Sequence, residues 1–137
     1  MIRHDGISIR RSWEVCERAN VESRWTSNYV SLNRLGDIVL NRVAFKYLGE
    51  PEAVQLLYDR DSHTIGLKPV GSDADHAFPV RPRGNRGGYR IRANRLMREF
   101  GISLDETLMF RNTIRDRNGI MILNINDTDI LKSRQTW

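Results

Sequence analysis

The sequence predicts a mainly β protein with short helices (β+α), in which two β-β-α-β-β repeats share one core. Segments 36–49 and 88–101 both run from a glycine through an apolar strand and a short helix to a closing glycine at the same spacing. A β-hairpin pattern follows each closing glycine. A unit of about 45 residues seldom buries a complete core alone. We therefore expect the two units to pack their apolar faces together as a covalent pseudo-dimer.

Residues 1–28 differ in pattern from the rest and are predicted to form an N-terminal arm. We expect a short strand over 7–9 and a helix that begins at Trp13 with Ser12 as its cap. Trp13 and Trp25 either pack this arm onto the repeats or contact a partner. The sequence therefore leaves association into a homo-oligomer open.

The first repeat is predicted to cover residues 29–70. Apolar residues alternate over 30–32 and 38–40, which indicates two half-buried strands joined at Gly36. Asn41 is expected to cap a short helix that Gly49 ends in the left-handed conformation. Strands over 53–58 and 64–68, joined by a polar turn, complete this repeat as a hairpin.

A small, acidic linker over 71–77 leads to the second repeat, residues 78–125. Its first connection, 81–88, is long and glycine-rich, and we expect a mobile loop with an open backbone. A strand over 89–92, a helix over 94–100 and a hairpin of strands 107–114 and 120–125 follow, with Asn118 and Gly119 in the last turn. The tail 126–137 is expected to fray, although docking of Ile130, Leu131 and Trp137 stays open.

Composition excludes several classes of protein. No stretch approaches the roughly 18 apolar residues of a membrane helix, and the start has no apolar secretory segment, so we expect no membrane partner. Cys16 is the single cysteine, which rules out an internal disulfide and suits the reducing cytoplasm. We therefore expect a cytoplasmic protein.

Catalytic and ligand-binding patterns are also missing from the sequence. The three histidines are far apart, and the aspartate pairs at 59/61 and 73/75 lack the remaining ligands of a calcium loop. Segment 84–88 is glycine-rich but lacks the lysine and hydroxyl residue of a P-loop. We expect no catalytic residue, no metal and no cofactor, and hence a protein that is not an enzyme.

Positive charge is concentrated in one segment. Residues 81–98 contain seven arginines and no acidic residue or lysine, a formal charge of +7 within a net charge of +5, so the rest of the chain carries −2. A cationic region on a nearly neutral body is typical of a protein that binds a polyanion. The alternative is a solvated face neutralised by internal partners such as Glu99, Asp105 and Glu106.

The first repeat resembles the AbrB/MazE/MraZ superfamily of swapped-hairpin β-barrels. Gly36, the apolar triplet 38–40, Leu48 and Gly49 occupy the family's core positions, and a hairpin follows where the family has one. The resemblance covers residues 29–70 and, more loosely, 78–125. Two units in one chain are most similar to the MraZ arrangement. The resemblance implies a pseudo-dimeric swapped-hairpin barrel and a DNA-binding transcriptional regulator or antitoxin.

The sequence departs from the family where the family contacts DNA. Three family residues are replaced in both copies. The arginine after the glycine is replaced by Asp37 and Tyr89, the proline by Asn41 and Ala93, and the arginine inside the helix by Phe45 and Met97. The resemblance therefore implies the fold, and contact residues have to come from neighbouring positions. The candidate nucleic-acid-binding residues are Arg81, Arg83, Arg86, Arg90, Arg92, Arg95 and Arg98 in the second repeat, with Arg34 and Arg42 in the first.

These residues predict binding of nucleic acid and favour duplex DNA, because guanidinium groups form paired hydrogen bonds with phosphates and guanine edges. Tyr89 either stacks on an exposed base or packs on a neighbouring strand. The alternative function is a protein interaction module on the same fold, an antitoxin-like or assembly component, that binds an acidic protein and no DNA.

Overall fold

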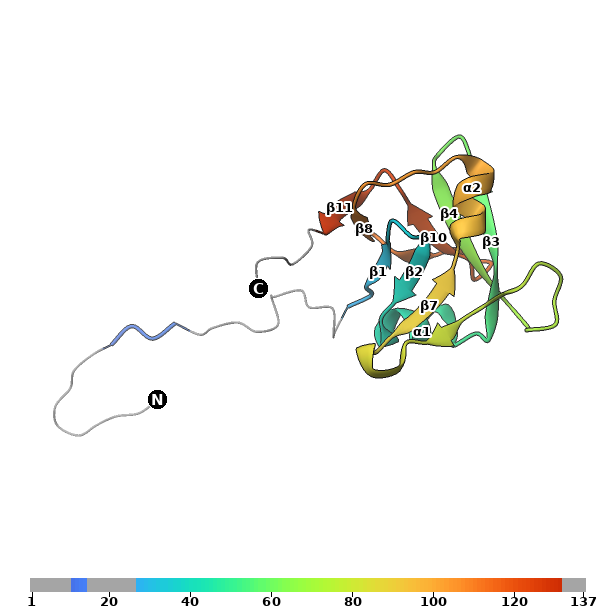
Figure 1. Cartoon of the computed structure of the whole chain (residues 1–137). Helices are drawn as coiled ribbons and strands as arrows, with labels where there is room; N and C mark the ends of the chain where they lie inside the picture. The colour runs from blue at the N-terminus through green and yellow to red at the C-terminus, as the bar shows by residue number, and fades with distance from the viewer. Residues whose placement is uncertain (1–10, 15–26, 132–137) are drawn as a thin grey trace.

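The computed structural model describes residues 11–14 and 27–131 (Figure 1). The predicted strand at 7–9, most of the predicted N-terminal helix, Trp25 and the end of the tail lie outside the described residues. Residues 11–14 form neither helix nor strand, and Trp13 is 83% exposed. None of the described helices has the length and apolar composition that crossing a bilayer requires.

The predicted mainly β class is confirmed by eleven strands and two short α-helices in the described residues. The strands form two antiparallel sheets, and their hydrogen bonds leave no closed barrel in this part of the chain. The six-stranded sheet has the order β11 (Thr128–Leu131), β8 (Thr107–Phe110), β1 (Val30–Leu32), β2 (Asp37–Leu40), β7 (Tyr89–Arg92), β6 (Arg81–Pro82). The five-stranded sheet has the order β5 (Phe78–Pro79), β3 (Ala53–Asp59), β4 (Thr64–Val70), β10 (Met121–Asn124), β9 (Ile114–Arg115).

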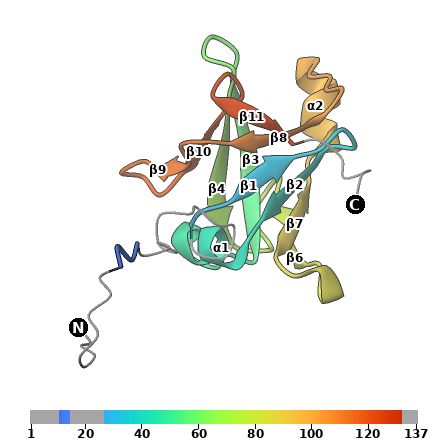
Figure 2. The same ribbon diagram turned by 90° about the vertical axis from the view of Figure 1, so that its left-hand side faces the viewer.

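Strands of the predicted first repeat, 29–70, pair with strands of the predicted second repeat, 78–125. β1 pairs with β8, β2 with β7, and β4 with β10. The two sheets face each other across one cluster of buried side chains that draws on both segments (Figures 1 and 2). Its largest fully buried members are Leu32, Ile38, Leu40, Leu48, Ile65, Leu67, Ile91, Met121 and Leu123.

Both helices begin and end close to where the sequence predicts. In α1 (Arg42–Leu48) the Asn41 side chain accepts a hydrogen bond of 2.9 Å from the Ala44 backbone N–H, as its capping role predicts. α2 (Asn94–Phe100) buries Leu96 and Met97. Gly49 and Gly101 follow the two helices in the left-handed conformation. The two predicted helices are therefore confirmed.

The glycines are equally spaced in the two repeats, but the strands that follow them bury different positions. Ile38 and Leu40 of β2 face the core, and equal spacing would put Arg90 and Arg92 at the corresponding places in β7. Instead Ile91 faces the core. A shift of one residue moves every side chain of a strand to the other face. The arginines of β7 consequently point away from the core.

The segment 81–88 is more ordered than the sequence predicts. Arg81 and Pro82 form β6 and pair with β7, and the Arg83 N–H donates to the Gly88 carbonyl at 3.0 Å. A 3-10 turn (Gly84–Arg86) joins the two strands, with positive φ at Gly84, Gly87 and Gly88. The expectation of an open backbone is therefore wrong for 81–83, while 84–87 stay exposed, because three glycines allow the chain to form a hairpin here. The mobility of the segment stays a prediction.

The predicted final hairpin and the fraying tail are also corrected. β8 leaves the predicted hairpin and pairs with β1 and β11, so that within 107–115 only Ile114 and Arg115 pair with β10. The chain therefore changes sheets over 111–113. β11 takes up residues 128–131 of the predicted tail, with Ile130 opposite Leu108.

Gly36→Ala is expected to destabilise the protein more than Gly49→Ala. Both glycines have positive φ (+91° and +101°), so each substitution carries left-handed backbone strain, about 1–2 kcal/mol. A Cβ at Gly36 would lie 2.6 Å from Asn94 Cα, whereas a Cβ at Gly49 meets no atom within 4 Å. We expect a further loss of about 1–3 kcal/mol in the free energy of unfolding for Gly36→Ala, measured by urea denaturation. Equal losses would contradict the packing of Gly36 on α2.

Candidate nucleic-acid interface

The outer face of the six-stranded sheet carries the arginines of β6 and β7. Directly opposite residues in an antiparallel pair lie on the same face. Arg81 is opposite Arg90, and Arg90 is opposite Val39. Because Ile91 lies in the core, Arg90 and its neighbours two positions away face outward. The prediction that Arg90 and Arg92 share one face is therefore confirmed.

The guanidinium groups of this hairpin are close enough to affect one another. Partial burial lowers the pKa of Arg83, and the nearby charges of Arg86 and Arg90 lower it further. Asp37 opposes this effect and raises the pKa of Arg83. Three arginines and one aspartate thus share a common electrostatic field at the β6–β7 hairpin.

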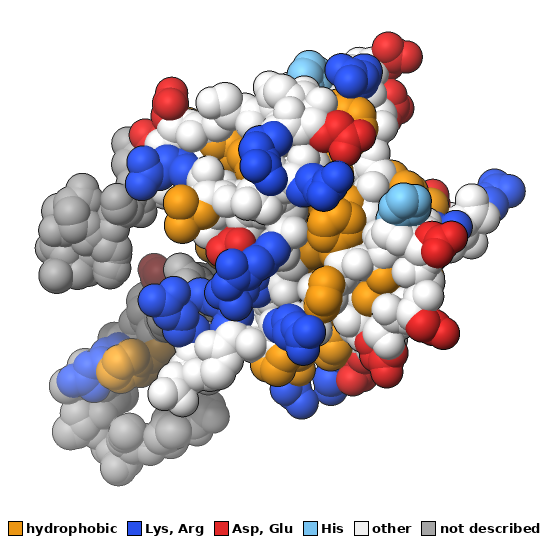
Figure 3. Space-filling model, turned by 45° about the vertical axis from the view of Figure 1, so that its right-hand side comes forward, with side chains coloured by type: hydrophobic (Ala, Val, Ile, Leu, Met, Phe, Trp, Pro, Cys, Tyr) orange, Lys and Arg blue, Asp and Glu red, His pale blue; other side chains and the backbone are white. Residues whose placement is uncertain are grey.

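Within residues 27–131 no carboxylate forms an ion pair with these arginines. In residues 27–131 the ion pairs within 4.0 Å join Arg111 to Asp127 at 3.4 Å and to Asp129 at 3.5 Å. The internal partners that the sequence suggested, Glu99, Asp105 and Glu106, form none with the seven arginines of 81–98 in the described structure. Figure 3 shows Lys and Arg side chains in a broken band across this face of the molecule, with acidic side chains more frequent toward its right-hand edge.

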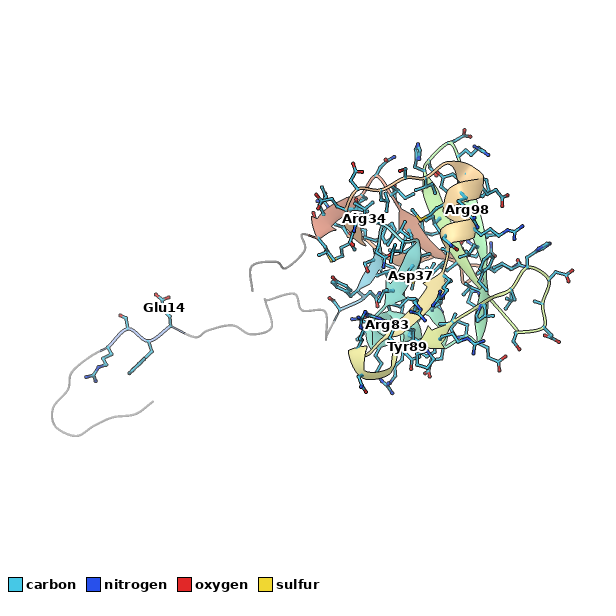
Figure 4. The ribbon with its side chains drawn as sticks, viewed as in Figure 1. Glu14, Arg34, Asp37, Arg83, Tyr89 and Arg98 are labelled. Carbon is cyan, nitrogen blue, oxygen red and sulfur yellow. The ribbon has the colours of Figure 1, made fainter. Side chains whose placement is uncertain are left out.

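Arg95 and Arg98 lie on the exposed side of α2, as predicted, while Leu96 and Met97 of the same helix are buried. Figure 4 places Asp37 between Arg83 on one side and Arg34 and Arg98 on the other. The arginines therefore do not meet at one point. They extend from the β6–β7 hairpin across the sheet to α2.

Two glycine contacts connect the first-repeat arginines to this surface. Gly36 lies against Asn94, which brings the turn that contains Arg34 to the start of α2. Gly88 lies against the Leu40 carbonyl and Asn41, which brings the start of α1, and with it Arg42, to the end of the β6–β7 hairpin. The arginine surface is defined here by these nine residues: Arg34, Arg42, Arg81, Arg83, Arg86, Arg90, Arg92, Arg95 and Arg98.

The sequence did not identify Asp37 as part of this surface. Asp37 is directly opposite Arg92 on the neighbouring strand. Only the pairing of β2 with β7, two strands about fifty positions apart in the chain, brings this carboxylate among the arginines. No local pattern around residue 37 carries that information.

Tyr89 packs within the protein, on a helix instead of on the neighbouring strand that the sequence suggested. Its ring stacks on the ring of Phe45 with centroids 3.7 Å apart and an angle of 14° between planes. One ring face is therefore covered by α1. In the described residues no group of three or more His, Cys, Asp or Glu side chains is placed to hold a metal ion.

Comparison with protein-family models, with curated proteins and with solved structures finds no match to this chain.

Arg90→Gln is expected to raise the free energy of unfolding at low salt, and Arg111→Gln to lower it. Arg90 is directly opposite Arg81, and a like-charge cross-strand pair is destabilising by roughly 0.2–1 kcal/mol. Arg111 instead makes two exposed ion pairs, which are worth a similar small amount. Urea denaturation at low salt and at about 1 M salt measures the change in the free energy of unfolding that each variant causes. Both changes should be smaller at about 1 M salt, where screening is strong. A destabilising Arg90→Gln at low salt would refute the repulsion.

Proposed function

We propose that this chain is a non-enzymatic protein that binds duplex DNA through the arginine surface. The observation that carries the proposal is a set of seven guanidinium groups in 81–98 that face outward or lie at a hairpin, with no carboxylate paired to any of them in the described structure. Such charge is unfavourable by itself and becomes favourable next to a polyanion, which releases its counterions on binding.

The presence of arginine supports DNA binding more specifically than the net charge does. The planar guanidinium group bonds phosphate oxygens and guanine edges in pairs, whereas an ammonium group acts as a point charge. The segment contains arginine and no lysine. A role in transcriptional regulation, and with it a place in the cytoplasm, rests on the resemblance to AbrB-type regulators.

We propose further that the two halves are AbrB-like units joined as a pseudo-dimeric swapped-hairpin arrangement. The interleaved pairing of β2 with β7 and of β4 with β10 supports this proposal. So do the two seven-residue helices, each followed by a left-handed glycine. The reciprocal contacts of Gly36 with the start of α2 and of Gly88 with the start of α1 give further support.

Fluorescence anisotropy with a labelled random duplex tests the DNA proposal. Contact with about five phosphates predicts a slope near −4.5 for log K against log salt. The double variant Arg90→Ala, Arg92→Ala should weaken binding and reduce the magnitude of this slope by about two. Arg117→Ala, in the exposed β9–β10 turn, removes an arginine outside the surface and should leave the slope unchanged.

Absence of binding at low salt would refute the proposed function. Recovery of a defined acidic protein that stays bound after nuclease treatment, together with that absence, would favour the interaction module instead. If Arg117→Ala reduced the magnitude of the slope as much as the Arg90→Ala, Arg92→Ala variant, DNA would bind by overall charge and not through the arginine surface.

Asp37→Asn is expected to strengthen DNA binding about two- to fivefold at low salt. The carboxylate lies opposite Arg92 and within the field of Arg83, so it repels an approaching phosphate. Asp73→Asn, in the exposed 71–77 connection, removes the same charge away from the arginines and serves as the control. Titrations of both variants at several salt concentrations check this. An equal gain in both would attribute the effect to net charge.

A further inference from the structure

The β6–β7 hairpin projects from the body of the protein, at the lower right of Figure 2. Its turn is exposed over 84–87, and a Cβ added at Gly84 or Gly87 would meet no atom within 4 Å. Arg83 and Arg86 flank these glycines. The tip therefore combines an accessible backbone with two guanidinium groups.

We propose that this hairpin enters the major groove of duplex DNA as a two-stranded ribbon, with Arg83 and Arg86 at the guanine edges. This inference rests on the proposed function and specifies how the same surface recognises its ligand. It assigns base recognition to the tip and leaves phosphate contact to the remaining arginines.

The width of the hairpin selects the groove. Paired strands lie about 4.8 Å apart, and their side chains add to that width. The major groove of B-DNA is about 12 Å wide and admits a two-stranded ribbon, whereas the minor groove is about 6 Å wide. At Arg81–Arg90 and Pro82–Tyr89 the hairpin is still part of the six-stranded sheet, because β7 also pairs with β2 there. Beyond these pairs the Arg83 N–H bond to the Gly88 carbonyl continues the hairpin as two strands toward the tip.

Charge and chemistry favour guanine as the base that is read. Guanine presents two acceptors, N7 and O6, in the major groove, and arginine bonds both at once. Partial burial lowers the pKa of Arg83, and the neighbouring charges of Arg86 and Arg90 lower it further, so these like charges repel its guanidinium group. Paired acceptors on a base would relieve this repulsion. The exposed glycines let the tip approach the base edges closely.

Within residues 29–70 the connection equivalent to this ribbon, between β1 and β2, is short. It is the turn 33–36, in which the Asn33 side chain accepts the backbone N–H groups of Leu35 and Asp37 at 2.9 and 3.0 Å. A symmetric protein dimer reads a palindromic site with two equivalent elements. Because the β6–β7 ribbon has no equivalent between β1 and β2, we expect a single asymmetric site of guanine contacts.

The test compares three duplexes of about two helical turns that share a central G·C block. In one, 7-deazaguanine replaces guanine and removes the N7 acceptor from the major groove. In another, inosine replaces guanine and removes the minor-groove amino group alone. Anisotropy titrations should show at least about a fivefold loss of affinity for the 7-deazaguanine duplex, the lower range for one paired contact. The inosine duplex should bind within about twofold of the parent.

A charge-preserving variant assigns this discrimination to the hairpin tip. Arg83→Lys with Arg86→Lys keeps both positive charges but removes the planar fork. The variant should discriminate less between the parent and 7-deazaguanine duplexes than the unaltered protein does, because an ammonium group lacks the fork that fits N7 and O6 together, and it should keep the salt slope. Arg95→Lys with Arg98→Lys, on α2, should retain the discrimination.

The outcomes separate the two proposals. Equal affinity of the unaltered protein for parent and 7-deazaguanine duplexes would overturn the ribbon inference and leave DNA binding intact. A greater loss with inosine would overturn it as well, since recognition would then lie in the minor groove. No binding to any duplex at low salt would remove the proposed function together with the inference.

Discussion

The pairing of β2 with β7 is the constraint on which the arrangement of core and charge depends. It sets Ile38 opposite Ile91 on the core side and Asp37 opposite Arg92 on the outer side. A slip of one residue in β7 would turn Arg90 toward the core in place of Ile91. A buried guanidinium group without a partner costs several kcal/mol, so the apolar contact fixes the register and the register fixes where the arginines face.

The arginines at the two edges of the six-stranded sheet have different charged neighbours. At the β11 edge Arg111 makes ion pairs with Asp127 and Asp129, so its charge is balanced locally. At the β6 edge Arg81 faces Arg90 across the strands, with no carboxylate paired to either in the described residues. Solvent exposure keeps this repulsion small. The edge with unbalanced charge suits a binding surface for a polyanion, and its like charges add nothing to stability.

Features that depend on a few adjacent residues could be predicted from the sequence. The Asn41 cap, the left-handed Gly49 and Gly101, and the alternation in β7 are of this kind, because turn and cap chemistry acts within a few positions. The departure of β8 to pair with β1, through Ser31 opposite Met109, depends on strands far apart in the chain. Local propensity carries no such information. Asp37 in the candidate site was missed for the same reason.

The two halves differ in the length of an exposed connection, where a change in length disturbs the core least. Gly36 and Gly88 both bring a strand connection against the start of a helix in the other half, and both contacts leave no space for a side chain. Before Gly88 the chain extends outward as the β6–β7 hairpin, whereas before Gly36 it forms a short turn. Added length in an exposed connection has a small entropic cost and disturbs no buried contact. A recognition element can therefore be built on one half while the shared core keeps its packing.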